Sequence, residues 1–378
     1  MFLFISGSYS ASPEGIAASA QLLLDAMSKL YPKNKLELLT TNVPIIKEYI
    51  KKNQVFHVRY FDNWKTNFKN IKKYIHLLKK DNITVIHMEY PGNCYGKTLL
   101  ASFLPLITKL YTIKKKQKII FNVRLHEFTC ARLLRRIAII PILLFADAIY
   151  IPALNDRKAA KKIVGKKVKD TIIGANIEVF PMIKRKTDKK VISYFGSVYR
   201  GKGIKRMLNI WKQIKEADTE NQFEFKIIGE INSGNNNHFA EYHKQVMKWL
   251  KQYQMLDFVQ ITGYVTEQQA SEEIQNSYLA TLFYEDGLSL RRGSFLAYLT
   301  HGIPIVTTLG DEESVKLLKG NKGVFMSDDD CEIVNKIFEF AAMNEENLNK
   351  ITEMNKKIAK QFNWDKIAKK FLEDYGLI

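Results

Sequence analysis

The residues best suited to chemistry lie between Tyr284 and Thr308, in YEDGLSLRRGSFLAYLTHGIPIVTT. A predicted strand ends at Tyr284, an acidic loop follows, and a basic pair opens the next predicted helix. The polar positions are Glu285, Asp286, Arg291, Arg292, Gly293 and Ser294. A helix N-terminus presents free backbone N–H groups and the positive end of a dipole, and arginine adds fork-shaped donors. The pattern predicts a diphosphate site, with solvated arginines as the alternative.

A second loop could reach the same phosphates. In YFGSVYRGKGIKRMLNIW a predicted strand ends at Gly196, and the loop after it holds Arg200 and Lys202. Gly203 then lets the backbone turn closely into the next helix. Many α/β proteins have such a glycine loop, so its value as evidence comes from its pairing with the first segment.

Short apolar runs alternate with longer helical stretches, which is typical of parallel sheets with crossover helices. The expected strands are MFLFIS, LELLT, ITVIHM, KIIFNV, AIYIP and DTIIG in the first half, and VISYFG, EFKIIG, FVQITG, ATLFY and PIVTT in the second. We predict an α/β fold of two Rossmann-like, doubly wound domains facing a central cleft, where ligands bind at the carboxyl ends of strands. The polar segment FPMIKRKTDKK predicts a hinge near Ile183 to Asp188, and hence domains over 1–183 and 184–357.

Length and composition agree with two folded lobes, at 378 residues with 46% hydrophobic and 26% charged side chains. Cys94, Cys130 and Cys331 are far apart, which suggests neither a metal site nor a disulfide framework and fits a reducing cytosol. The apolar start MFLFIS is too short for a signal peptide. The apolar run 137–154 contains Asp147 and two prolines, so we predict a core helix leading into a buried strand rather than a membrane span.

The formal charge of +19 is concentrated in the first half of the chain. Residues 1–180 hold 30 Lys and Arg against 12 Asp and Glu, whereas residues 181–378 hold 28 against 27. Basic pairs such as Arg135 and Arg136 border apolar stretches, which suits an anionic membrane surface. A phosphate-bearing acceptor and a lysine-rich solvated surface are the alternatives. We expect no nucleic acid partner, because no motif for one accompanies the charge.

The order of these motifs resembles the retaining GT-B glycosyltransferases, specifically the family 4-like enzymes that include many bacterial polysaccharide and lipid glycosyltransferases. YFGSVYRGKGIKRMLNIW is similar to the family's Lys-Gly loop, GIPIVTT to its Gly-x-Pro strand, and FNVRLHEF to its His-containing strand end. SASPEGIAASAQLL resembles the glycine-bearing loop after the first strand, and FNWDKIAKKFLEDY the closing helix. The resemblance covers the whole chain. It implies that 1–183 binds the acceptor, that 184–357 binds a nucleotide-sugar, and that a helix at about 358–378 packs back on the first domain.

The resemblance also implies roles for single residues. Lys202 and Arg292, with Arg200 and Arg291, would neutralise the leaving diphosphate of a UDP- or GDP-linked sugar, so that neither a metal nor a further cofactor is needed. Other donor-side positions are Gly15, Gly196, Glu230, Tyr264, Val265, Gly293 and Ser294. His126 would bond the donor sugar or the acceptor. The acceptor-side positions are Glu127, which would orient the loop of His126, and Tyr90.

The implied activity is that of a hexosyltransferase-type enzyme that moves a sugar onto a glycan or lipid-linked acceptor. Transfer would proceed with retention, in the cytoplasm, with the enzyme peripheral at the inner face of the cell membrane. The role of the family's first acidic residue at the donor would belong to Glu285 or Asp286. The nucleophile stays unassigned.

One departure from the family pattern keeps other classes open. Most members carry two glutamates with seven residues between them, and the second is absent here, at the position aligned with Ala297. A non-catalytic subunit that binds a nucleotide or a partner is therefore the alternative. A dinucleotide-dependent oxidoreductase is disfavoured, because SGSYSASPEG lacks the G-x-G-x-x-G fingerprint. Asp328 to Asp330 is predicted to be a helix cap or a solvated turn.

Overall fold

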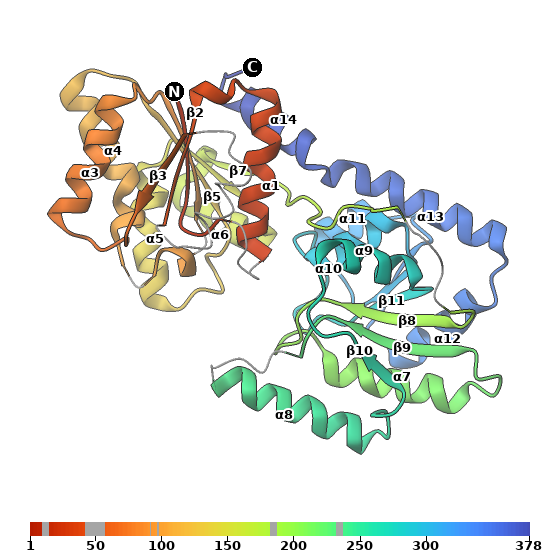
Figure 1. Cartoon of the computed structure of the whole chain (residues 1–378). Coiled ribbons are helices and arrows are strands. Elements are labelled where there is room, and N and C mark those ends of the chain that lie inside the picture. Colours follow the sequence, from red (N-terminus) through yellow and green to blue (C-terminus); the bar gives the residue numbers. More distant parts are fainter. Residues whose placement is uncertain (10–14, 42–56, 91, 97, 182–186, 232–236) are drawn as a thin grey trace. The chain divides into compact units, whose positions relative to one another are not determined.

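The computed structural model in Figure 1 describes residues 1–9, 15–41, 57–90, 92–96, 98–181, 187–231 and 237–378. The chain forms two compact units. Unit 1 comprises Met1–Gly174 with Asn363–Ile378, and unit 2 comprises Ala175–Phe362. The division thus lies N-terminal to the expected boundary, and most of the expected hinge, Ile183 to Asp188, falls outside the described residues.

Unit 1 is a seven-stranded parallel sheet between helices, with strand order β3-β2-β1-β4-β5-β6-β7. Its strands are β1 (Phe2–Ser6), β2 (Leu36–Thr41), β3 (His57–Phe61), β4 (Val85–Tyr90), β5 (Ile120–Leu125), β6 (Ala148–Ile151) and β7 (Val168–Asp170). Its helices are α1 (Gly15–Leu30), α3 (Phe68–Lys80), α4 (Leu100–Lys115), α5 (Leu133–Phe145), α6 (Leu154–Val164) and α14 (Trp364–Asp374). Short 3₁₀ helices span Lys33–Lys35, Gly92–Tyr95 and Gly165–Lys167.

The last helix, α14, belongs to unit 1 although its sequence follows unit 2. It packs beside α1, as Figure 1 shows, and Trp364 and Phe371 join the core formed by Phe2 and Phe4. Gly174 makes room for this contact, since a Cβ there would lie 2.4 Å from the Trp364 ring. A glycine at this position therefore lets the C-terminal segment close against the sheet.

Unit 2 is a six-stranded parallel sheet with order β10-β9-β8-β11-β12-β13. Its strands are β8 (Lys190–Phe195), β9 (Phe223–Ile228), β10 (Val259–Ile261), β11 (Leu279–Leu282), β12 (Ile305–Thr307) and β13 (Val324–Met326). Its helices are α7 (Ile204–Ala217), α8 (Asn237–Gln252), α9 (Glu267–Asn276), α10 (Gly293–His301), α11 (Glu312–Leu318), α12 (Asp330–Ala341) and α13 (Glu345–Ala359), followed by a 3₁₀ turn at Lys360–Phe362.

In both sheets the first strand of the unit lies in the middle. β1 lies between β2 and β4, and β8 lies between β9 and β11. The strand order therefore reverses between β1 and β4 in unit 1 and between β8 and β11 in unit 2. Open α/β sheets bind ligands at such a switch point, beyond the carboxyl ends of the strands. The prediction of two doubly wound, Rossmann-like domains is therefore confirmed.

Three local expectations need correction. β3 and β13 were not predicted, because both are short and the exposed side chain of His57 interrupts the apolar pattern of β3. The last strand of unit 1 is Val168–Asp170, not DTIIG, which follows it. The predicted core helix in the run 137–154 is correct for one face of α5 only: Ile139, Ile142 and Leu143 lie in the core, whereas Ile137, Ile140 and Leu144 are more than 40% exposed. The buried strand after α5 is β6, as predicted.

Candidate functional site

Two loops meet at the switch point of unit 2, one after β8 and one after β11. Gly203 has a φ of 63°, and a Cβ at this position would lie 1.6 Å from the carbonyl oxygen of Phe283. The N–H of Glu285 donates to the carbonyl of Gly201 over 3.2 Å. Since only glycine allows this close approach, the two loops that sequence analysis paired are held together by backbone contacts.

A cavity of about 310 Å³ opens between these loops. It is lined by Tyr199, Arg200, Gly201, Lys202, Glu285, Asp286 and Arg292. Five of these were predicted from the sequence: Arg200, Lys202, Glu285, Asp286 and Arg292. An aromatic contact was missed: behind the lining residues, the buried ring of Tyr284 has its centre 4.6 Å from the Arg292 guanidinium and 5.4 Å from the Lys202 Nζ.

Positive charge dominates this cavity. Burial, followed by repulsion from Arg292, lowers the pKa of Lys202 from 10.5 to about 8, and Asp286 offsets this only in part. Asp286 forms an ion pair with Arg292, but no described residue accepts a hydrogen bond from the buried Nε of Arg292. Arg200, Lys202 and Arg292 thus line the cavity against two exposed carboxylates, Glu285 and Asp286. The excess of positive charge, on cations that are partly desolvated, favours an anionic ligand.

The N-terminus of α10 borders the same cavity. Arg292 is the N-cap in an extended conformation, and its own side chain does not cap the helix. The hydroxyl of Ser294 is buried and bonds the hydroxyl of Tyr284 over 2.7 Å, and the Tyr284 hydroxyl also accepts from the backbone N–H of Phe295. The backbone N–H groups of Gly293 and Ser294 therefore remain for an anion.

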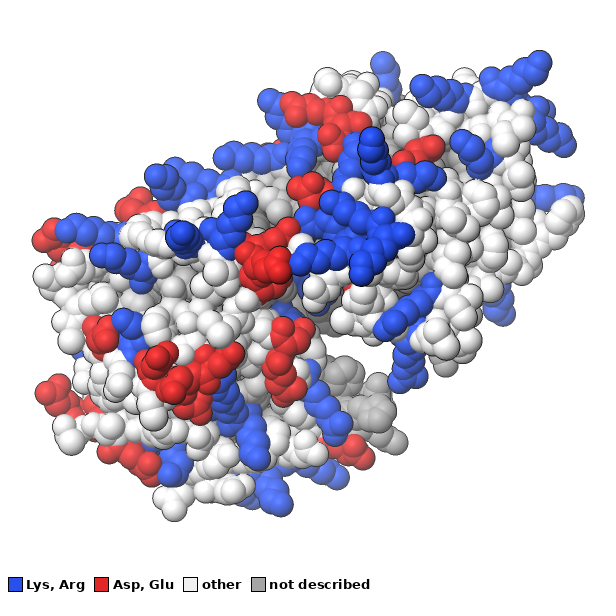
Figure 2. All heavy atoms as spheres, turned by 180° about the vertical axis from the view of Figure 1, so that it is seen from behind, with Lys and Arg blue, Asp and Glu red and all other residues white. Residues whose placement is uncertain are grey.

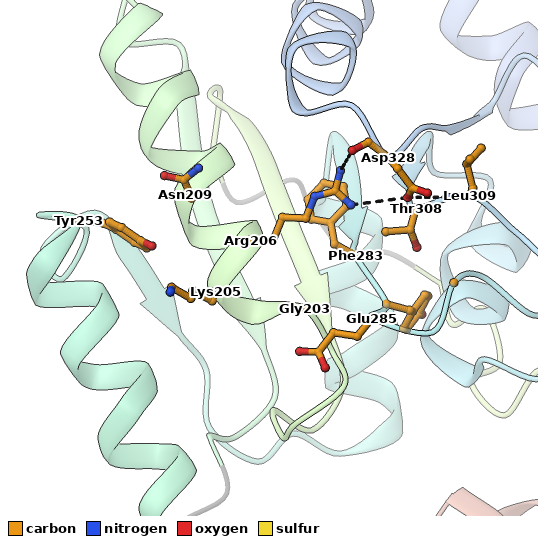
Figure 3. A pocket seen from close by; sticks show the side chains of 12 residues that line it. Gly203, Lys205, Arg206, Asn209, Tyr253, Phe283, Glu285, Thr308, Leu309 and Asp328 are labelled. Carbon is orange, nitrogen blue, oxygen red and sulfur yellow. Dashed lines mark hydrogen bonds and ion pairs between the residues drawn. The ribbon is translucent and has the colours of Figure 1, made fainter. Parts of the chain in front are cut away.

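A second cavity of about 630 Å³ shares Glu285 with the first and extends along α7 (Figure 3). Of its two cations, Lys205 is exposed and Arg206 is already paired: Nε of Arg206 donates to Asp330 over 2.7 Å, and a terminal nitrogen donates to the carbonyl of Asp328 over 2.7 Å. Asp329 caps α12 through the N–H of Glu332, as the predicted helix cap requires. This cavity was not foreseen from sequence, and it is the weaker anion site because Arg206 is paired and Lys205 is solvated.

Other predicted donor-side residues do not line the smaller cavity. Gly196 has a φ of 124°, and its carbonyl would lie 2.6 Å from a Cβ at Gly229, so it brings two strand ends together. Glu230 is exposed, and its carbonyl accepts from the N–H of Val198. Tyr264 is 75% exposed and, with Val265, precedes the cap of α9. Arg291 and Gly293 flank Arg292 without lining the cavity.

In unit 1, His126 follows β5 and is 7% exposed. Its Nε2 lies 2.5 Å from a carboxylate oxygen of Glu89, a buried residue of β4 that sequence analysis missed. A glutamate inside the apolar strand VIHMEY was the available signal, because a buried charge requires a partner. Burial alone would raise the pKa of Glu89, but Arg124 and His126 outweigh it and hold that pKa well below 4.5.

The remaining predicted residues of unit 1 have structural partners. Glu127 forms an ion pair with Arg135 over 2.7 Å. Tyr90 is 4% exposed, and its hydroxyl bonds Ser102 over 2.8 Å, which places it in the core. Gly15 begins α1, and the loop residues 10–14 before it lie outside the described residues.

Ala297, which the resemblance aligned with the second glutamate of the family pattern, lies in the core of unit 2. It is fully buried in α10, and its carbonyl accepts a hydrogen bond from His301 over 2.7 Å. An ionised side chain buried at this position would need a charged or hydrogen-bonding partner.

No protein-family model matches the sequence, and no curated protein matches it either. Solved structures do match over the whole chain. A glycosyltransferase from Rickettsia africae has a TM-score of 0.72 at 13% identity, covering 99% of this chain and 97% of that one. Anabaena HepE in complex with UDP and glucose has a TM-score of 0.70 at 14% identity, covering 100% and 99%.

The lipopolysaccharide outer core galactosyltransferase WaaB is also similar, with a TM-score of 0.65 at 12% identity and complete coverage of both chains. At these identities the likeness concerns the fold. Each of these chains carries the same pair of parallel-sheet units from end to end. The protein thus has the GT-B fold of the glycosyltransferases to which it is similar.

Proposed function

We propose that this protein is a glycosyltransferase that takes a sugar from a nucleoside-diphosphate donor, with the diphosphate bound in the smaller cavity of unit 2. The observation that carries the proposal is the excess of partly buried positive charge on Lys202 and Arg292, beside the open N-terminus of α10. The fold supports it, because the similar HepE structure holds UDP and glucose.

This arrangement suits cleavage of a sugar–phosphate bond. Negative charge develops on the leaving diphosphate, and fixed cations aimed at it lower the barrier without reorganisation. Lys202 and Arg292 supply the charge that a metal ion supplies in other transferases, so we expect turnover to survive EDTA. Glu285, exposed at the mouth of both cavities, is the acidic group best placed to touch the donor. Retention, a hexosyl group and a glycan or lipid-linked acceptor remain parts of the proposal.

Thermal unfolding with UDP, GDP, ADP, CDP and NAD in turn tests the donor site. A ligand that binds only the native state raises the midpoint by mass action. We expect one nucleoside diphosphate, UDP or GDP, to stabilise the protein and NAD to have no effect. The shift should vanish in a Lys202→Ala, Arg292→Ala double variant.

A matched control removes two exposed lysines of α8 in the same unit, Lys244→Ala with Lys248→Ala, and should keep the shift. Stabilisation of the double variant as strong as that of the unaltered protein would place the nucleotide elsewhere. Nucleotide binding without transfer to any acceptor would favour the non-catalytic subunit.

We further propose that unit 1 is peripheral at an anionic membrane surface on the cytoplasmic side. Helices α4 and α5 pack side by side and expose an apolar strip, the α4–α5 ridge. The ridge consists of Leu110, Ile113, Leu133, Leu134, Ile137, Ile140 and Leu144, each more than 40% exposed. Exposed basic residues next to it in sequence are Lys109, Lys114, Lys115, Lys116, Arg132 and Arg136.

Charge supports the same placement. Unit 1 holds 33 Lys and Arg against 14 Asp and Glu, whereas unit 2 holds 25 of each, so unit 1 carries the whole net charge of +19. On the face in Figure 2, basic side chains form patches that alternate with uncharged surface. Apolar side chains bordered by cations bind an anionic membrane surface both by burying apolar area and by electrostatic attraction to the lipid headgroups. No described helix is both long and apolar enough to cross a bilayer.

Flotation with liposomes that contain anionic lipid, at low and high salt, tests this placement. We expect salt-sensitive co-flotation that falls several-fold in a Leu134→Ser, Ile137→Ser variant. The matched control is Leu309→Ser with Val315→Ser, two exposed apolar residues of unit 2. Failure to co-float at low salt would remove the membrane from the proposal and leave the donor site untouched.

A further inference from the structure

A buried charged cluster surrounds Glu89 in unit 1. Glu89 is fully buried, and its Oε1 accepts hydrogen bonds from His87 Nε2 over 2.9 Å and from Arg124 over 3.3 Å. Among the residues that the structure describes, its Oε2 bonds only to His126 Nε2, at 2.5 Å. The two carboxylate oxygens are thus divided between different partners.

This division determines which nitrogen of neutral His126 carries the proton. An ionised carboxylate only accepts hydrogen bonds, so Nε2 of His126 must be the donor. The Arg124 guanidinium, with hydrogen bonds from His126 and His87, holds the pKa of Glu89 well below 4.5 against the effect of burial and keeps the carboxylate ionised at neutral pH. Nδ1 of His126 is then unprotonated, and no described residue bonds to it.

The far side of the cluster is anchored by the C-terminal helix. Nδ1 of His87 lies 2.5 Å from the hydroxyl of Tyr375, which follows α14, and accepts from it when Nε2 donates to Glu89. The Arg124 guanidinium lies 5.5 Å from the ring centre of Trp364 and donates to the carbonyl of Ile172 over 3.0 Å. The partners of Glu89 are therefore held in place from outside the sheet.

We propose that Glu89 is a positioning residue that holds His126 as the Nε2–H tautomer, so that Nδ1 is presented as an acceptor for a substrate hydroxyl group. A hydrogen-bonded carboxylate that fixes the tautomer and orientation of a histidine is an established device in acyl-transfer enzymes. That a substrate hydroxyl donates to Nδ1 rests on the proposed glycosyltransferase function, because sugar hydroxyls are then the available donors. The tautomer itself rests only on the geometry of unit 1.

The experiment is ¹⁵N NMR of histidine-labelled full-length protein at a pH of ~8.5, about two units above the ordinary histidine pKa. The chain has seven histidines, and His126→Asn assigns the resonance of interest. We expect a protonated Nε2 and an unprotonated Nδ1 for His126. A protonated Nδ1 in the unaltered protein would overturn the proposal, and this result needs neither a variant nor a ligand.

Glu89→Gln gives a sharper test, because an amide has one acceptor and one donor group. Arg124 only donates, so the glutamine oxygen should turn towards it and the NH₂ towards His126. Nε2 of His126 must then accept, and we expect the tautomer to switch to Nδ1–H. An unchanged His126 tautomer in folded Glu89→Gln would also overturn the proposal.

Tyr375→Phe is the matched control. It removes the hydroxyl that bonds His87 and should change the His87 resonances while those of His126 keep the Nε2–H pattern. A change in His126 as large as that in Glu89→Gln would show that loss of packing, and not the carboxylate, moves the tautomer. Failure of every nucleotide to bind would refute the proposed function and leave these spectra unaffected.

Discussion

The two charged clusters of this protein differ in how their charges are balanced. In unit 1 the carboxylate of Glu89 is buried and surrounded by partners of this chain, namely His87, Arg124 and His126. In unit 2 Lys202 and Arg292 are partly exposed around a cavity, where Asp286 forms an ion pair with Arg292 and Glu285 also lines the wall. Both carboxylate oxygens of Glu89 have partners of this chain, whereas the cations of the unit 2 cavity outnumber the carboxylates beside them.

The difference indicates which cluster binds and which positions. A buried charge whose partners are all intramolecular contributes rigidity and fixes the orientation of its neighbours. Cations held near one another at a desolvation cost, as the depressed pKa of Lys202 shows, are compensated only when an anion arrives. This contrast supports the two proposals, a donor bound in unit 2 and a positioning role for Glu89. Four measurements test it.

The largest effect is expected from Glu89→Leu. The substitution leaves Arg124 and His87 buried without an anion, and breaking a buried ion pair in this way costs about 3–5 kcal/mol. Urea unfolding should show this loss in the free energy of unfolding. Glu285→Leu replaces an exposed carboxylate at the surface and should change the free energy of unfolding by less than about 0.5 kcal/mol. Equal losses in the two variants would contradict the contrast.

Gly203→Ala tests the contact that joins the two loops of unit 2. A Cβ would lie 1.6 Å from the Phe283 carbonyl oxygen, and a φ of 63° costs a non-glycine residue about 1–2 kcal/mol by itself. We expect a stability loss above about 2 kcal/mol, measured by thermal unfolding, with loss of nucleotide binding. At Gly293 a Cβ meets open space, so Gly293→Ala serves as the control and should be near neutral.

Lys202→Met should separate stability from binding. Keeping the Lys202 ammonium charged in the folded state lowers the free energy of unfolding, and this effect is fully present below pH 8, because the folded pKa of about 8 lies below the ordinary 10.5. Removing the ammonium should therefore raise the free energy of unfolding at pH 7 by on the order of 1 kcal/mol. Nucleotide affinity should fall by about 10- to 100-fold, the worth of one charge-assisted hydrogen bond.

Calorimetric titration with the nucleoside diphosphate that the unfolding screen identifies measures the loss of affinity. Lys244→Met, on the surface of α8, should change neither quantity. A Lys202→Met protein that is less stable and binds as before would make this lysine a structural residue.

The smallest effect is a pH dependence of nucleotide binding. A bound anion raises the pKa of Lys202, so binding takes up a proton between the free value of about 8 and the higher bound value. Affinity should therefore weaken as pH rises above 8, by up to about tenfold per unit. Titrations from ~pH 7.5 to ~9.5 measure it, where the nucleotide phosphates keep their charge. A slope that persists in Lys202→Met would assign the titration to another group.

Sequence reasoning found most of the unit 2 site, because its residues lie in two continuous loops. Lys202 and Arg292 each follow a recognisable strand and precede a helix, so local periodicity and glycine placement were sufficient. The same reasoning missed the contacts of the Tyr284 ring with Lys202 and Arg292, and it missed the larger cavity. The residues that line the larger cavity come from several segments that only the sheet order brings together.

The sequence by itself determined the alternation of strands and helices, the glycine-bearing loops and the uneven charge, because these are properties of neighbouring residues and of composition. Tertiary structure alone decided that Glu89 meets His126, 37 positions later, since parallel pairing of β4 with β5 sets that contact. It also decided that α5 exposes Ile137, Ile140 and Leu144, which belong to an apolar run that predicted a core helix. Burial depends on what covers a helix, and the chain's local pattern does not contain that information.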